Sequence, residues 1–70
     1  MQRVDVYSRD SQGHSYYVEE VIEDVHGGTW DHTDEIAGHT RYCIERATPA
    51  EVTALCTRLA GVAQILVAKH

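Results

Sequence analysis

The stretch from Thr48 to His70 constrains the fold most, because it carries the start and the end of a helix. Thr48-Pro49-Ala50-Glu51 predicts a capping box, in which the Thr48 hydroxyl accepts a first-turn N–H and the Glu51 carboxylate accepts the Thr48 N–H. Proline suits the first helical position, where its missing N–H would have no intrahelical partner. Apolar residues then recur on one stripe at helical spacing: Val52, Leu55, Cys56 and Leu59.

A glycine ends this helix and a strand follows it. Gly61 favours the left-handed conformation that closes helices, so the sequence predicts a helix over residues 49–60. The apolar run that follows predicts a strand over residues 64–68. Cys56 lies on the apolar stripe, and we expect it to be a small, buried core residue.

The N-terminal half predicts a strand and a second helix. Val4 and Val6 alternate with polar residues, which favours a half-buried strand over residues 3–8. In residues 15–25 the valines, the isoleucine and Tyr17 fall on one side of a helical wheel, and the acids fall on the other. β-Branched residues favour a strand, but a strand would mix acids and valines on both faces. We therefore predict a helix, closed by Gly27.

The middle of the chain predicts two more strands, over residues 29–33 and 40–46, joined by a turn over residues 34–38. Alternation in the later strand places Tyr42 and Ile44 on one face and Cys43 on the other. The order is then β-α-β-β-α-β. It predicts an α+β fold of the ferredoxin-like, split βαβ type, with a four-stranded antiparallel sheet and both helices on one face. Residues 1–70 form a single domain in this interpretation.

The composition of the chain disfavours nucleic-acid binding and a membrane-spanning protein. A chain of 70 residues has a thin core, so self-association is a natural source of further buried surface. The formal net charge is −5, and no Lys or Arg lies between Asp10 and Arg41, which disfavours nucleic-acid binding. No apolar run is long enough to span a bilayer and no signal-peptide pattern opens the sequence, so we expect a cytoplasmic protein without a membrane partner.

The cysteines, histidines and serines of the sequence match no known catalytic motif and no known metal-binding motif. Cys43 and Cys56 lack the spacing of metal ligands. His26, His32 and His39 lie near acids in the sequence, yet their spacing matches no recognised ligand pattern, and we interpret them as surface residues or as groups that titrate near neutral pH. No nucleophile–base pattern is present. The sequence therefore predicts no enzyme, no cofactor and no metal site.

At this point the chain resembles an ACT domain, a small regulatory module of amino-acid enzymes. The family's first strand ends in Asp-x-x-Gly, as in Asp10-Ser11-Gln12-Gly13, and Leu59-Ala60-Gly61-Val62 resembles the turn before its last strand. His14-Ser15 stands where the family has apolar residues, and Thr29-Trp30 where it has an Asn-Ile-like pair. Small ligands contact the family at these positions. The resemblance implies a ligand site built from the following residues: Asp10, Ser11, Gln12, Gly13, His14, Gly28 and Thr29.

The residues of the first loop support an anion site independently. The loop from Arg9 to His14 precedes the first helix, so its amides would lie at a helix N-terminus and favour a carboxylate. Gly13 would let the backbone approach a ligand closely. An ordinary turn that requires glycine explains the same residues.

Two functions follow from this interpretation. The first is a non-catalytic regulatory module that binds a small molecule, an amino acid in the simplest case, at a homodimer interface. The alternative is an acidic protein-interaction module or stand-alone inhibitor, which acts through its acidic face or an open sheet edge. In the dimer, Trp30 is the expected interface anchor on an edge strand. The outer sheet face would present Tyr7, Cys43 and Leu66.

Overall fold

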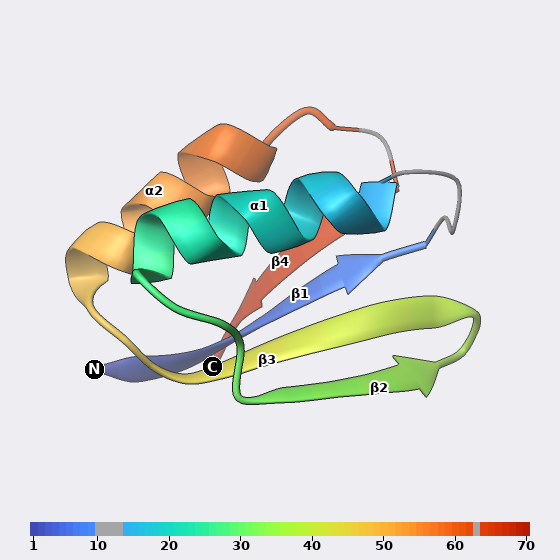
Figure 1. The fold of residues 1–70 in the computed structure, drawn as a ribbon, viewed down its shortest axis with the longest axis horizontal. Helices are drawn as coiled ribbons and strands as arrows, with labels where there is room; N and C mark the ends of the chain where they lie inside the picture. Colours follow the sequence, from blue (N-terminus) through green and yellow to red (C-terminus); the bar gives the residue numbers. More distant parts are fainter. Residues whose placement is uncertain (10–13, 63) are drawn as a thin grey trace.

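The computed structural model describes residues 1–9, 14–62 and 64–70, and side chains in α1 from residue 16 onward. Its elements follow the predicted order β-α-β-β-α-β: β1 (Gln2–Ser8), α1 (His14–His26), β2 (His32–Ile36), β3 (His39–Ala47), α2 (Pro49–Leu59) and β4 (Ile65–Lys69). The four strands form one antiparallel sheet in the order β2-β3-β1-β4. Both helices lie on the same side of that sheet (Figure 1). The predicted α+β fold is confirmed.

The start of α2 has the predicted geometry. The Glu51 amide donates to the Thr48 hydroxyl at 3.1 Å, and the Thr48 amide donates to the Glu51 carboxylate at 2.8 Å. The second bond, from backbone to carboxylate, is the main cause that lowers the pKa of Glu51. Pro49 is the first helical residue, and Gly61 follows the helix with a φ of +78°. This capped helix is therefore specified by local sequence at both ends.

The core fills the space between the helices and the sheet. The prediction of a helix rather than a strand after Tyr17 is confirmed, and α1 buries its apolar side completely at Val18, Val21 and Ile22. Cys56 was expected to be buried but is only partly so, because it lies at the margin of the core beside β4. The buried cluster consists of Val4, Val6, Val18, Val21, Ile22, Tyr42, Ile44, Ala47, Val52, Leu55 and Leu59.

The second strand differs from its predicted position. The predicted strand over 29–33 and turn over 34–38 are wrong, because β2 is His32–Ile36 and only Ala37 and Gly38 lie between it and β3. Both turn residues have positive φ values, 51° and 81°, as a two-residue type I′ hairpin turn requires. Alanine is rarely found in that conformation, so Ala37-Gly38 is only a weak signal for this turn.

Trp30 lies before β2 and not within it. Its ring packs edge-on against Tyr42, with the centroids 4.9 Å apart and the planes at 79°. The indole is half-buried beside the core. Trp30 therefore stabilises the connection between α1 and the sheet. The sheet edge is formed by β2, which does not contain Trp30.

Within the described part of the chain, no helix is long and apolar enough to cross a membrane, and the longer of the two, α1, has 13 residues.

Candidate functional site on the open face of the sheet

The strand register decides which side chains lie on the sheet face opposite the helices, here called the open face. Val4 and Val6 are fully buried under the helices, so the alternate residues of β1 point to the open face. Directly opposite residues share a face, and Asp5 pairs with Cys43 of β3 while Tyr7 pairs with Leu66 of β4. The predicted outward orientation of Tyr7, Cys43 and Leu66 is therefore confirmed.

The centre of the open face holds a buried carboxylate. Asp5 is only 1% exposed, although no helix covers it. Arg3 Nε donates to Asp5 Oδ1 at 3.2 Å, and His70 Nε2 lies 2.9 Å from Asp5 Oδ2. Burial by itself would raise the pKa of Asp5, but hydrogen bonds from Arg3, Cys43 and His70 outweigh it and lower the pKa below its ordinary value. Asp5 is therefore ionised at neutral pH and anchors the charged side chains around it.

A second ion pair joins β3 to β2. Arg41 donates to Asp34 through both Nε, at 2.9 Å, and Nη2, so the pairing is bidentate. Arg41 and Asp34 are directly opposite in the register. The hydrogen bond from Arg41 is the main cause that lowers the pKa of Asp34, and the same bond raises the pKa of Arg41.

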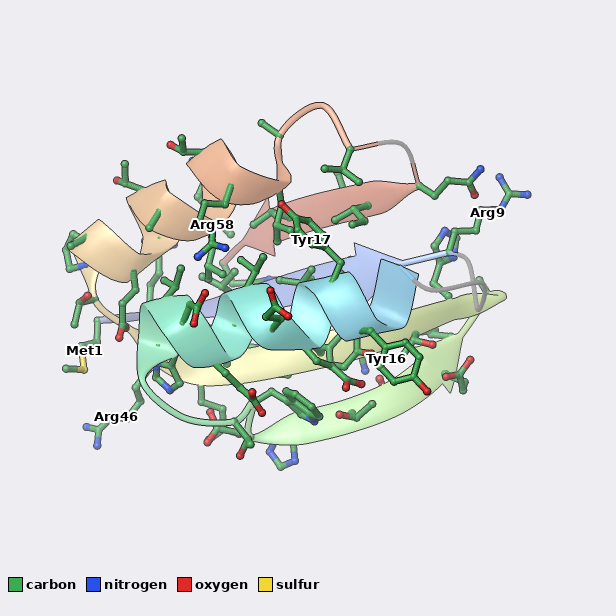
Figure 2. The ribbon with its side chains drawn as sticks, turned by 45° about the horizontal axis from the view of Figure 1, so that its top comes forward. Met1, Arg9, Tyr16, Tyr17, Arg46 and Arg58 are labelled. Carbon is green, nitrogen blue, oxygen red and sulfur yellow. The ribbon has the colours of Figure 1, made fainter. Side chains whose placement is uncertain are left out.

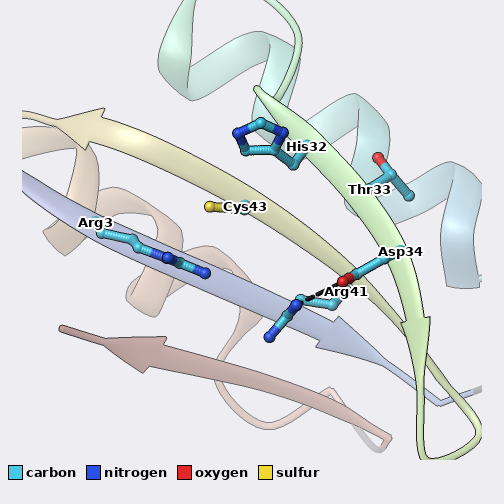
Figure 3. A pocket seen from close by; sticks show the side chains of 6 residues that line it. All are labelled: Arg3, His32, Thr33, Asp34, Arg41 and Cys43. Carbon is cyan, nitrogen blue, oxygen red and sulfur yellow. Dashed lines mark hydrogen bonds and ion pairs between the residues drawn. The ribbon is translucent and has the colours of Figure 1, made fainter.

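These two ion pairs border a hollow of about 280 Å³ on the open face, which Figure 3 shows from close by. The Arg3 side chain extends along β1 so that its guanidinium points toward that of Arg41 (Figure 3). Each arginine donates two of its N–H groups to an aspartate, and Arg41 also forms a hydrogen bond with Tyr7. A guanidinium has five N–H donors in all, so each of the two has donors beyond these bonds. The hollow is lined by Arg3, His32, Thr33, Asp34, Arg41 and Cys43.

The thiol in this hollow is poorly suited to nucleophilic chemistry. Cys43 is 3% exposed, and burial followed by its hydrogen bond to Asp5 raises the pKa of the thiol. The thiolate is the reactive form of cysteine, so this group stays protonated at neutral pH. The hollow therefore offers hydrogen bonds and charge from Arg3, Arg41 and Asp34 and not a nucleophile.

The structure separates the residues of the predicted ligand site. Asp10, Ser11, Gln12 and Gly13 lie outside the described residues. His14 begins α1, whereas Gly28 and Thr29 follow its other end, about 20 Å away at 1.5 Å per residue. One chain does not bring these two ends together, and a site made from both would need two copies.

Local sequence did not indicate the open-face hollow. Its side chains belong to β1, β2 and β3, and Asp5 meets Cys43 only because β1 pairs with β3. Charged residues at alternate positions of a strand usually mark a solvated face. The only signal was an aspartate flanked by two buried valines, and it becomes informative only when the strand register is known.

The histidines lie at separate places in the fold. His26 Nδ1 lies 3.2 Å from Glu51, His32 Nε2 lies 2.7 Å from Glu45, and His39 Nδ1 lies 3.1 Å from the Ala37 carbonyl. Among residues 1–9, 14–62 and 64–70, no three His, Cys, Asp or Glu side chains lie close enough together to hold a metal ion.

Comparison with known proteins gives no relative from which a function could be transferred. No protein-family model matches the chain, and neither the curated proteins nor the solved structures include a significant match. The function is therefore inferred from the site.

Proposed function

We propose that this chain is a non-catalytic regulatory module that binds a small carboxylate-bearing molecule, in the simplest case an amino acid, in the open-face hollow. The observation that carries this proposal is the pair of guanidinium groups, Arg3 and Arg41, that point toward each other across the hollow. Arginine binds carboxylates through paired N–H donors. Asp34 at the same hollow supplies the negative charge that an ammonium group would approach.

We also propose that the chain has a ferredoxin-like fold. Read from its other edge, the strand order is β4-β1-β3-β2, with both helices on one face. This order supports the ferredoxin-like class, and with it the resemblance to ACT domains. A shared fold is only an analogy for function, so the ligand class rests on the hollow and its charges.

The segment predicted from the sequence remains a second place for the same kind of ligand. That site would bind an anion through backbone amides. It would combine residues 10–14 of one copy with Gly28 and Thr29 of another. The hollow would bind it through arginine side chains. Substitutions can therefore distinguish the two sites.

Thermal unfolding with a panel of amino acids tests the proposal, because a ligand that binds only the native state raises the melting temperature. We expect at least one amino acid to raise it by several degrees when present far above its Kd. Arg3→Met and Arg41→Met should each abolish that rise.

Arg58→Met is the matched control. Arg58 is likewise an arginine in an ion pair with an aspartate, 3.3 Å from Asp24, but it lies on α2 in the helical layer (Figure 2). It should keep the full ligand response. Absence of any response across the panel, or an equal loss in Arg58→Met, would contradict the hollow as the site. A response lost only in Gly28→Val would favour the segment predicted from the sequence.

The acidic protein-interaction module remains the second candidate because of one exposed aromatic residue. Tyr16 is 78% exposed on α1 and projects from the helix (Figure 2), in the same helix as the exposed Glu20 and Glu23. An exposed tyrosine beside acids suits a basic protein surface. Salt-sensitive binding of a cationic peptide that Tyr16→Ala weakens, together with no amino-acid response, would favour this function.

A further inference from the structure

The two edges of the sheet differ in how they are protected against pairing with another strand. All five residues of β2 are exposed, and its charged side chains are engaged in pairs such as His32–Glu45 and Arg41–Asp34. Charged side chains on an edge strand discourage another strand from pairing with it. The other edge, β4, is apolar from Ile65 through Ala68, and Leu66 is 63% exposed. It has no charge before Lys69.

The backbone of β4 has a register that fixes which groups face outward. The His70 amide donates to the Arg3 carbonyl at 3.0 Å, and the Arg9 amide donates to the Gln64 carbonyl at 2.9 Å. In an antiparallel pair, alternate residues direct both backbone groups toward the neighbouring strand. The even-numbered residues of β4 therefore face β1. The odd-numbered residues turn their backbone groups to the free edge, with Val67 at the centre.

We propose that β4 is a self-association edge, which pairs antiparallel with β4 of a second copy so that Val67 lies opposite the partner subunit's Val67. At this centre the two valines exchange both N–H···O=C bonds. The Lys69 amide can donate to the carbonyl of the partner subunit's Ile65. The Ile65 amide already donates to the Val62 carbonyl at 3.3 Å, so it adds no hydrogen bond between the two copies.

The side chains are self-complementary in this register. Leu66 lies opposite the partner subunit's Ala68 on the open face, and Lys69 lies opposite the partner subunit's Ile65 on the helix side. No charged residue faces its own kind. In β2 the even-numbered residues face β3, so the same symmetric pairing would be centred on Thr33 or Glu35. Centring on Glu35 places it opposite the partner subunit's Glu35, and centring on Thr33 places Glu35 opposite the partner subunit's Asp31. Like charges in these positions are destabilising. Charge complementarity therefore selects β4 over β2.

The pairing also covers an apolar groove beside the strand. The groove has a volume of about 250 Å³ between the end of α2 and β4, and its lining is Cys56, Leu59, Ala60, Gly61, Ile65, Leu66 and Val67. Val67 points to the helix side, as its pairing with Val6 shows. The partner subunit's Val67 would lie beside this groove, and a thin-cored chain would gain buried apolar surface. The open-face hollow lies over β1, β2 and β3, so it stays accessible.

Sedimentation velocity of the full chain from low micromolar to millimolar concentration tests the proposal. We expect a reversible dimer whose Kd rises on the order of tenfold or more in Leu66→Lys, since burying a leucine is worth at least a decade of affinity. Val67→Pro removes an outward N–H but no bond to β1, and should weaken the dimer similarly. Ile36→Lys is the matched control on the β2 edge, where Ile36 is 43% exposed. It should leave the Kd unchanged.

Hydrogen exchange identifies the edge directly, even if Val67→Pro fails to fold. On dilution of the wild type, the Val67 and Lys69 amides should exchange faster, whereas those of Leu66 and Ala68, which face β1, should not change. A monomer at every concentration, or a dimer weakened by Ile36→Lys and not by Leu66→Lys, would overturn the proposal.

Discussion

Replacement of Asp5 by asparagine should destabilise the chain strongly at neutral pH and weakly in acid. The change keeps the shape of the side chain but removes its charge. It also puts an amide NH₂ group where Arg3, His70 and the Cys43 thiol all act as donors. The side chain has almost no access to water, since Asp5 is 1% exposed. The lost interactions therefore cannot be replaced by hydration of residue 5.

The magnitude follows from the partners of Asp5. Hydrogen bonds to charged groups contribute roughly 1.5–3 kcal/mol each, and loss of the charge removes about half of that. The side chains of Arg3 and His70 are 48% and 50% exposed, so water restores part of what they lose. We expect Asp5→Asn to lower the free energy of unfolding by about 2 kcal/mol, which corresponds to a fall of roughly 10 °C in melting temperature.

The pH dependence provides the sharper test. Because the folded-state pKa of Asp5 is lowered, its contribution is fully present above its unfolded pKa of about 3.9 and is lost as the pH falls toward the folded value. Urea unfolding of wild type and variant between pH 7 and pH 2.5 should show two stabilities that converge below about pH 4.

Asp24→Asn is the control, because Asp24 forms an exposed ion pair with Arg58 at 3.3 Å. It should change the stability little, as exposed pairs do. A stability difference between wild type and Asp5→Asn that is the same at pH 7 and pH 2.5 would refute the assigned role of Asp5. An effect as small as that of Asp24→Asn would refute it as well.

Three further outcomes are expected. Leu55→Ala should cost on the order of 2–5 kcal/mol in urea unfolding, because Leu55 is fully buried at the centre of the core. Thr48→Ala should cost about 1 kcal/mol in the same assay by removing the cap of α2, and an effect near zero would mean that the cap is dispensable. In timed alkylation followed by mass spectrometry at pH 7.5, Cys56 should react before Cys43, which is 3% exposed and has a raised pKa. The opposite order would contradict the protonated, buried state of Cys43.

Sequence predicted the helices best, because their determinants are local. The capping box needs only Thr48 and Glu51, and the choice of helix for α1 needs only the separation of acids from valines along one segment. The predicted position of the second strand was wrong because aspartate and glutamate, here Asp34 and Glu35, are uncommon in strands. Only pairing with β3 reveals that they belong to one.

The open-face hollow could not be predicted from the sequence for a different reason. Asp5, Cys43 and His70 are distant in the chain, and they meet through the pairing of β1 with β3 and β4. Taken alone, Arg3 and Arg41 resemble solvated strand residues. Their orientation toward one another depends on the aspartate that each of them binds. Such a site follows from tertiary register, which short sequence motifs do not encode.

The most direct test of the central claim is a nuclear magnetic resonance titration of the ¹⁵N-labelled chain with the amino acid that raises its melting temperature most. We expect saturable shifts of the side-chain Nε–H signals of Arg3 and Arg41 and of the Cys43 amide, with the Arg58 Nε–H signal unchanged. Shifts confined to residues 10–14 and 28–29, or no saturable shift at all, would contradict binding in the open-face hollow.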